Sequence, residues 1–204
     1  MATPKKTLIL FAHPAIHKSR VNRAMMDAVK NLENVTFHDL YAAYPDLYID
    51  VEKEKKLLLE HELIILQHPF YWYNTPAILK EWSDLVLEFG FAYGPGGDHL
   101  VNKFWMHAIS TGGPETAYHS QGYNRYTMRQ LLAPWDQTAY LCGMVFIPPF
   151  VIHGSLKYNQ SHDLKAIGEE YKNTVLKLQN EEINIRTLNQ LEKINQKINQ
   201  KETK

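Results

Sequence analysis

The sequence has a single cysteine and no excess of either charge. Cys142 is alone among 204 residues, so no internal disulfide can form, and a reducing, cytosolic setting is the simpler interpretation. Lysine plus arginine and aspartate plus glutamate number 22 each, so no electrostatic argument favours nucleic acid or an anionic membrane as the main partner. Together these two features favour a small-molecule partner.

Long hydrophobic runs are absent too. Only about seven apolar residues lie between the start MATPKK and His13, too few for a secretory signal, and no run approaches the roughly 18 residues of a membrane span. Hydrophobic residues at 45% and charged residues at 22% are ordinary globular values, and the length suits one well-filled domain. We therefore expect a soluble, cytoplasmic protein.

Metal-ligand spacing is also scarce. His13 and His17 are four residues apart, but Pro14 between them breaks the helix that would place both on one face. No HExxH motif occurs, and the other histidines have no cysteine or carboxylate partners at ligand spacing. We predict no metal site.

Short apolar runs alternate with longer helical patterns. The runs typical of strands are 7–13, 35–41, 63–69, 104–110 and 144–152, and the helical patterns are 19–32, 51–60, 76–89, 126–142 and 162–178. Such alternation indicates βαβ units and a mainly parallel sheet that is covered on both faces. The predicted fold class is therefore α/β, a flavodoxin-like three-layer α/β/α sandwich with a five-stranded parallel sheet.

The composition changes at Glu181, where asparagine, glutamine, lysine and glutamate begin to dominate. Leu188, Leu191, Ile194 and Ile198 recur at three- and four-residue spacing, which would place them along one face of a helix. That helix would be either solvated and frayed or a partner-binding element. We predict a domain over residues 1–180 and a polar, helical or disordered tail over 181–204 that lies outside the core.

Three loops that follow predicted strands carry polar or aromatic side chains. In the first loop, Ser19 is a candidate N-cap with Asn22 three residues on, and a helix start with hydroxyl and amide groups suits a phosphate. An ordinary helix cap is the alternative for this loop. The third loop, Ser110–Gly113, offers hydroxyls and paired glycines that let a ligand approach the backbone, although such a sequence is often a plain turn.

The second loop places aromatic residues between the strand 63–69 and a helix that begins near Pro76. Phe70, Tyr71, Trp72 and Tyr73 would suit a flat, conjugated ligand, because open α/β sheets bind ligands at the carboxyl ends of their strands. Packing in the core or at a subunit interface is the alternative. Taken together, the three loops would lie side by side and would contact the phosphate, the ring and the ring edge of FMN. A dinucleotide site is less well supported, because no GxGxxG follows the first strand.

Six ordered motifs carry a resemblance to a known family. They are LILFAHP with Ser19 and Asn22, YPDLYID (44–50), QHPFYWYNTPAILKEW (67–82), FAYGPGG (91–97), STGGPE (110–115) and CGMVFIPPFVIHG (142–154). They resemble the flavodoxin-like NAD(P)H:quinone oxidoreductases, above all the ancillary flavoproteins of glutathione-gated potassium efflux systems and their general NAD(P)H oxidoreductase homologues. The resemblance covers residues 7–178.

The resemblance implies non-covalent FMN and a set of residues that bind it. The implied cofactor-binding residues are His13, Ser19, Arg20, Val21 and Asn22 for phosphate and ribityl, Phe70, Tyr71, Trp72 and Tyr73 for the ring, and Ser110, Thr111, Gly112 and Gly113 for the ring edge. Quinone reductases of the family place a tyrosine and a histidine beyond the paired glycines. Tyr118 matches the tyrosine, Asn124 stands where the histidine would be, and we take the neighbouring His119 as the second catalytic candidate.

The resemblance further implies an activity and partners. A hydride from NADH or NADPH would pass through flavin N5 to a quinone-like acceptor, in a two-electron ping-pong reaction. A homodimer is expected, with FAYGPGG (91–97) contributing to the partner's site. A different function remains open, that of a redox-sensing regulatory subunit that docks on a membrane potassium antiporter from the cytoplasmic side. An electron-carrier flavodoxin is disfavoured, because those carriers are shorter and strongly acidic.

Overall fold

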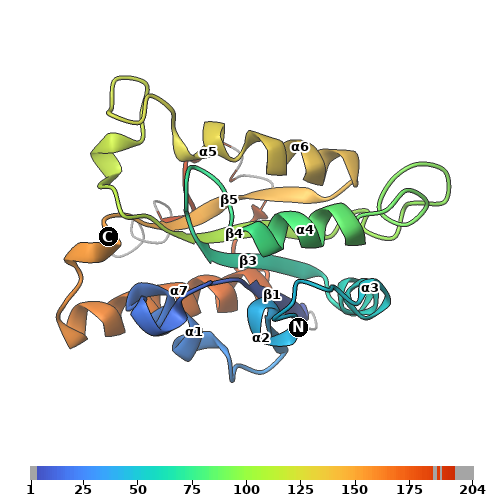
Figure 1. Cartoon of the computed structure of the whole chain (residues 1–204), viewed down its shortest axis with the longest axis horizontal. Helices are drawn as coiled ribbons and strands as arrows, with labels where there is room; N and C mark the ends of the chain where they lie inside the picture. Colours follow the sequence, from blue (N-terminus) through green and yellow to red (C-terminus); the bar gives the residue numbers. More distant parts are fainter. Residues whose placement is uncertain (1–3, 186–187, 189, 196–204) are drawn as a thin grey trace.

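Five parallel strands form the centre of the molecule (Figure 1). The computed structural model describes residues 4–185, 188 and 190–195. Its strands are β1 (Thr7–Phe11), β2 (Val35–Asp39), β3 (Leu63–Pro69), β4 (Phe104–Ser110) and β5 (Val145–Ile152). They pair in the order β2-β1-β3-β4-β5, and every pair is parallel. This is the flavodoxin-like strand order, so the predicted five-stranded parallel sheet is confirmed.

Helices cover both faces of the sheet (Figure 1). One face carries α1 (Val21–Val29) and α7 (Ser161–Gln179), which pack against each other. The other carries α2 (Leu40–Ala43), α3 (Val51–Glu60), α4 (Ala77–Val86), α5 (Met128–Leu131) and α6 (Ala133–Leu141). The molecule is therefore the predicted three-layer sandwich.

The strands are apolar along their length because both faces of the sheet are covered. In β1, Leu8 and Leu10 belong to the apolar cluster under α3 and α4, whereas Ile9 between them belongs to the cluster under α1 and α7. All three side chains are fully buried. Alternate side chains of a strand point to opposite faces, so a strand between two helical layers has no solvent-facing side.

One predicted helix is divided in two. The pattern over 126–142 gives α5 and α6, separated at Leu132, whose backbone (φ −89°, ψ 4°) leaves the helical range. Pro134 explains the break, because proline has no N–H to donate within a helix and suits only the first turn of a new one. Thr127 and Gln130 form a capping box that begins α5.

The segment that follows α7 packs against the core. Ile185, Leu188 and Ile194 are buried and belong to the apolar cluster of α1 and α7. The prediction that the polar tail lies outside the core is therefore wrong for these residues. Leu188, Leu191 and Ile194 were predicted to lie along one face of a helix that is either solvated or partner-binding, but they pack in the apolar cluster of α1 and α7.

This segment also covers the free side of β5, which is an edge strand. The Ile194 N–H donates to the Pro149 carbonyl at 3.0 Å, and the Val151 N–H donates to Asn195 Oδ1 at 2.9 Å. Backbone groups of an edge strand that would otherwise be unpaired are thus satisfied. Ile198, the last residue of the predicted stripe, lies outside the described residues.

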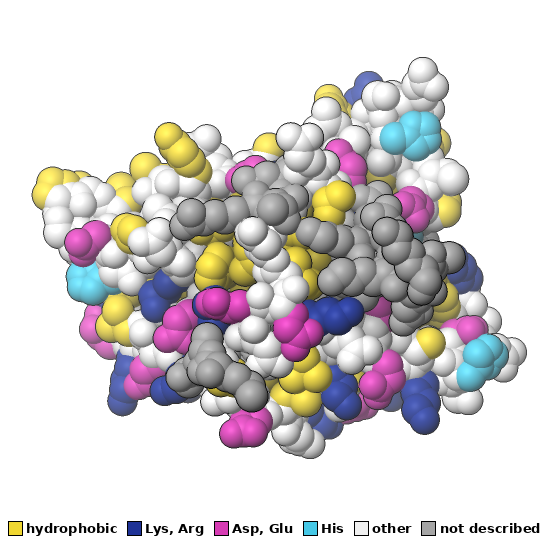
Figure 2. All heavy atoms as spheres, turned by 180° about the vertical axis from the view of Figure 1, so that it is seen from behind, with side chains coloured by type: hydrophobic (Ala, Val, Ile, Leu, Met, Phe, Trp, Pro, Cys, Tyr) yellow, Lys and Arg dark blue, Asp and Glu magenta, His cyan; other side chains and the backbone are white. Residues whose placement is uncertain are grey.

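Basic and acidic side chains are interspersed on the surface. On the face that carries α7 and the segment after it, Lys and Arg side chains alternate with Asp and Glu side chains (Figure 2). No helix in the described part of the chain is long and apolar enough to cross a membrane. The described residues also contain no group of three or more histidine, cysteine, aspartate and glutamate side chains that could hold a metal ion.

Candidate functional site

The three predicted loops meet at the carboxyl ends of neighbouring strands. β3 lies between β1 and β4, and the register aligns Phe11 with Gln67 and Pro69 with Ser110. The loops are also bonded to each other, since the Phe70 N–H donates to the Ser110 carbonyl at 2.8 Å. The predicted side-by-side arrangement of the loops is confirmed.

Two adjoining cavities open between these loops. The first, here called the β1 cavity, has a volume of about 610 Å³ and lies against the loop after β1. The second, the β4 cavity, has a volume of about 500 Å³ and lies against the loop after β4. Phe70, Trp72 and Gly112 line both. Pockets of this size hold small molecules and cofactors, so the two cavities together suit an elongated ligand.

The loop after β1 forms the polar end of this site. His13, Ser19, Arg20 and Val21 all line the β1 cavity. Ser19 Oγ accepts the Asn22 N–H at 3.3 Å, as a capping residue does, although α1 begins only at Val21. The positive dipole end of α1, with the Arg20 guanidinium beside it, makes this end attractive to an anion.

Asn22 is buried beneath this loop and joins it to the loop after β4. Its Nδ2 donates to Ser110 Oγ at 2.6 Å and to Ser19 Oγ at 3.4 Å. Ser19 and Ser110 line the β1 cavity, whereas Asn22 is fully buried and does not. The amide therefore fixes the positions of two cavity hydroxyls. Its Oδ1 has no hydrogen-bond partner among the described residues.

The aromatic loop is a tight hairpin with unusual backbone angles. Tyr71 and Asn74 exchange backbone hydrogen bonds of 3.1 and 3.0 Å, and the two residues between them, Trp72 and Tyr73, have φ of 50° and 64°. Glycine or asparagine normally occupies such positions, and left-handed backbone at other residues costs about 1–3 kcal/mol each. Strain of this kind gathers at functional sites.

The exposure of these aromatics excludes the core-packing interpretation of the loop and leaves the flat-ligand and subunit-interface interpretations. Trp72 is 94% exposed, and Tyr71 and Tyr73 are 44% and 46% exposed, so these three side chains are not core packing. Phe70 is buried and closes the floor of both cavities. Exposed aromatics on a strained turn beside two cavities favour a surface that stacks on a flat ligand.

The Ser110–Gly113 loop contributes backbone more than side chains. Gly112 has open space where a Cβ would stand, and it lines both cavities. Thr111, predicted as a cofactor contact, is fully buried and lines neither cavity. Its hydroxyl donates to the Gly113 carbonyl at 2.8 Å. The Thr111 hydroxyl therefore shapes this turn from behind.

Tyr118 and Asn124 form the far wall of the β4 cavity. The Tyr118 ring lies 6.5 Å from the Phe70 ring, centroid to centroid, and the Tyr73 hydroxyl donates to Asn124 Oδ1 at 3.3 Å. Burial raises the pKa of the Tyr118 phenol above its usual value, against a smaller opposing effect of Thr111 and Asn124. Tyr118 therefore keeps its proton at neutral pH and can donate a hydrogen bond into the cavity.

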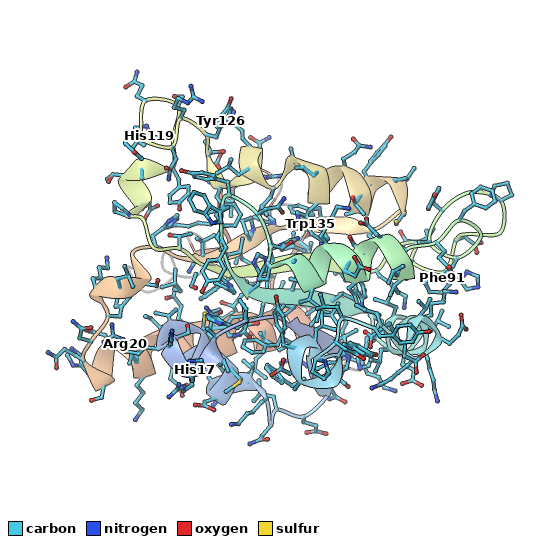
Figure 3. All side chains as sticks on the ribbon, viewed as in Figure 1. His17, Arg20, Phe91, His119, Tyr126 and Trp135 are labelled. Atoms are coloured by element: carbon cyan, nitrogen blue, oxygen red, sulfur yellow. The ribbon has the colours of Figure 1, made fainter. Side chains whose placement is uncertain are left out.

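The structure does not bring His119 into this site. His119 is exposed, its Nδ1 accepts the Gln121 N–H at 3.2 Å, and it lines neither cavity. Figure 3 shows it on the outer loop near Tyr126, well away from Arg20. Adjacent residues in a turn point in different directions, which explains why Tyr118 faces the cavity and His119 does not.

His153 was not predicted from the sequence, yet it packs against Tyr118. Its ring lies 5.1 Å from that of Tyr118, centroid to centroid, and its Nδ1 lies 3.2 Å from Thr111 Oγ1. Because the Thr111 proton goes to Gly113, His153 Nδ1 must carry the proton and donate to Thr111. Burial lowers the pKa of His153 to about 4, so the ring is neutral at pH 7. One feature of the sequence could have indicated His153: it directly follows β5, and the loops that follow β1, β3 and β4 carry the other site residues.

Further residues that the sequence analysis missed complete the β1 cavity. Lys18, Ser155 and Leu156 line it, and Arg20 Nη2 donates to the Leu156 carbonyl at 3.5 Å. Ser155 and Leu156 follow β5, so a fourth strand end takes part in the site. Lys18 adds a second positive side chain to the end that attracts anions.

Comparisons with known proteins show the family of the chain. The chain matches a family described as having a flavodoxin-like fold over residues 5–175. A glutathione-regulated potassium-efflux system ancillary protein KefG, from Erwinia tasmaniensis, is 44% identical over 176 residues, which cover 85% of this chain and 96% of that protein.

Two solved structures are also similar. One is general stress protein 14 from Treponema denticola in complex with FMN, 36% identical with a TM-score of 0.80, covering 85% of this chain and 99% of that one. The other is an NADPH-quinone reductase from P. pentosaceus, 31% identical with a TM-score of 0.75, covering 83% of this chain and 97% of that one.

Proposed function

Since the chain belongs to the family with the flavodoxin-like fold, we propose that it is an FMN-dependent NAD(P)H oxidoreductase. Its reaction would be the two-electron ping-pong transfer of a hydride from NADH or NADPH to a quinone-like acceptor, with flavin N5 of bound FMN supplying the hydride chemistry. The observation that carries the proposal is Trp72, an exposed aromatic held on a strained turn at the junction of a polar cavity and an aromatic one. The similar structures that bind FMN or reduce quinones support it.

The residues present fit FMN. The β1 cavity offers hydroxyls, a helix start and two positive side chains, which suit a phosphate and a ribityl chain. The β4 cavity offers Tyr73, Tyr118 and the open backbone of Gly112 and Gly113, which suit a flat ring with polar edges. Phe70 and Trp72 line both cavities, so a single elongated ligand would extend from one cavity into the other.

The chain's own residues have distinct parts in this mechanism. Bound FMN would supply the hydride chemistry at its N5 position. Trp72 and Phe70 would hold the ring in place, and the protonated Tyr118 hydroxyl would stabilise negative charge that develops on the reacting system.

A homodimer belongs to the proposal. The loop that contains residues 91–97 lies at the opposite end of the molecule from Arg20, as Phe91 shows in Figure 3. Phe89 beside it is 66% exposed. This loop cannot reach the site of its own chain, so it would act on the site of a partner. A monomeric mass in solution, with full activity, would rule this part out.

Reconstitution with FMN tests the proposed function. Apoprotein titrated with FMN should quench flavin fluorescence, and the loaded protein should oxidise NADPH or NADH when a benzoquinone is present. Comparison of the two nucleotides and of quinones, nitroaromatics and azo dyes would define the substrates. A chain that binds no FMN, or that binds it and oxidises neither nucleotide, would sink the proposal.

A second function is favoured by the similarity to KefG, a named ancillary protein of a potassium-efflux system. In this role the chain would dock on a membrane antiporter from the cytoplasmic side and report redox state. Such docking is compatible with oxidoreductase activity. Co-purification with a potassium antiporter from its own cells would support it, and an antiporter whose flux is the same with and without the chain would contradict it.

A further inference from the structure

Residues 190–195 lie beyond the region that the family matches, yet they contact both ends of the loop that carries the far wall of the β4 cavity. The family match ends at residue 175, and α7 ends at Gln179. Lys193 Nζ lies 2.7 Å from Glu115 Oε1. Glu115 begins the short 3-10 helix Glu115–Ala117, and the Tyr118 N–H donates to the Glu115 carbonyl at 3.0 Å. The segment therefore contacts the turn that holds Tyr118.

The same segment holds the other end of this cavity loop. Arg129, in the first turn of α5, donates from Nη1 to the Leu191 carbonyl at 3.2 Å. The chain between Glu115 and Arg129 contains Tyr118 and Asn124, which line the β4 cavity. Both ends of the cavity loop are thus attached to residues only two positions apart in the segment.

The segment can hold the loop because it is itself fixed to the sheet. Ile194, next to Lys193, is fully buried and donates its N–H to the Pro149 carbonyl of β5. Asn195 accepts from Val151 in the same strand. Lys193 therefore projects from an anchored backbone, and its side chain is only 15% exposed.

A second path from Lys193 to Tyr118 passes through His153. A cavity of about 330 Å³ behind Tyr118 is lined by Glu115, His153 and Lys193 as well as by Tyr118 itself. The His153 ring stands beside the Tyr118 ring and is bonded to Thr111. A displaced Lys193 side chain would remove the ion-pair partner of Glu115 beside this ring.

We propose that Lys193 is a positioning residue, which with the Leu191 carbonyl fixes both ends of the loop 115–129 and so sets Tyr118 and Asn124 in the wall of the β4 cavity. The use of that wall in a hydride-transfer reaction rests on the proposed function. The attachment itself does not, because it stands on contacts within the chain. The segment 190–195, which lies beyond the family match, is then a working part of the site.

Hydrogen exchange of the loop in the full chain tests this inference. Lys193→Glu and Glu115→Lys each remove the pair and set like charges side by side, so exchange of the amides in 115–127 should rise about two- to five-fold, the range for a partly exposed ion pair. The double variant Lys193→Glu with Glu115→Lys should restore slow exchange. Lys30→Glu, which breaks the exposed pair of Lys30 with Asp27 at the end of α1, is the matched control and should leave the loop unchanged.

The outcomes separate positioning from a passive surface pair. In the loaded enzyme, the two single variants should lower kcat for benzoquinone reduction more than they change KM, because Tyr118 acts on charge that develops during the reaction, and the double variant should recover kcat. Unchanged loop exchange in both single variants, or a double variant no better than the singles, would overturn the inference. Exchange is measured without nucleotide or acceptor, so a chain that lacks oxidoreductase activity would refute the proposed function and leave this result interpretable.

Discussion

Replacing Trp72 by asparagine should strengthen the apoprotein and weaken its hold on FMN. Trp72 adopts a left-handed backbone (φ 50°), which asparagine tolerates better than tryptophan does. The side chain is 94% exposed, so its removal costs almost no apolar burial. Relief of backbone strain should therefore raise the free energy of unfolding of the apoprotein by about 0.5–1.5 kcal/mol.

The effect on FMN should have the opposite sign. Stacking of a flat heterocycle on an aromatic side chain is worth about 1–3 kcal/mol, measured on nucleic-acid bases. The dissociation constant for FMN should therefore rise by about 5- to 150-fold. Urea unfolding of the apoprotein gives the first quantity, and quenching of flavin fluorescence on titration gives the second.

Tyr48→Asn is the matched control for this substitution. Tyr48 is 83% exposed, and it lines neither the β1 nor the β4 cavity. The control should change neither stability nor FMN affinity appreciably. Unchanged FMN affinity in Trp72→Asn would refute the assignment of the aromatic loop to the ring, and a destabilised apoprotein would refute the reasoning on strain.

Three further predictions concern other residues. Asn22→Ala should weaken FMN binding about 5- to 150-fold, because the amide that fixes the hydroxyls of Ser19 and Ser110 is lost. Fluorescence titration measures the affinity for FMN, and an unchanged affinity would contradict this prediction. Tyr118→Phe should slow quinone reduction about 10- to 100-fold whereas His119→Ala should not, and steady-state kinetics in which the two variants behave alike would show that the cavity wall is misassigned. Burial lowers the pKa of His68 to about 4 in the folded chain, so between pH 6.5 and 4 the unfolded chain binds more protons than the folded one. The free energy of unfolding must therefore fall as the pH falls through that window. His68 alone should account for about 2 kcal/mol of that loss at pH 5. Urea unfolding at pH 7 and pH 5 checks this, and equal stability at the two pH values would count against it.

The sheet could be predicted from the sequence because its strands are buried on both faces. Continuous apolar runs such as LIILQHP have no competing amphipathic interpretation, and the structure has β3 at the same residues. The predicted helix boundaries agree less closely with the structure. The division at Leu132 depends on Pro134, a local breaker that a periodicity argument over 126–142 ignored.

The tail could not be placed by the same reasoning. A polar segment with a few regularly spaced leucines and isoleucines has the same sequence pattern whether it is solvated or packed against the rest of the protein. Tertiary contacts determine its position, because apolar side chains of α7 and the free edge of β5 are available to Ile194 and its neighbours. No property of residues 181–195 alone contains that information.

The sequence predicted which loops form the site, but it could not predict the directions in which their side chains point. Strand ends brought Ser19, Phe70 and Gly112 to the same cavities, as the topology requires. His119 was chosen for its closeness to Tyr118 in sequence, but the turn sends it to solvent. His153 reaches Tyr118 from another strand, at a separation in sequence that no local pattern covers.

The most direct test of the account is an anaerobic titration of the FMN-loaded protein. One equivalent of NADPH or NADH should bleach the flavin absorbance, and one equivalent of a benzoquinone added afterwards should restore it in a single two-electron step. Flavin that stays oxidised with both nucleotides, or that is reduced but passes no electrons to the quinone, would contradict the proposed oxidoreductase function.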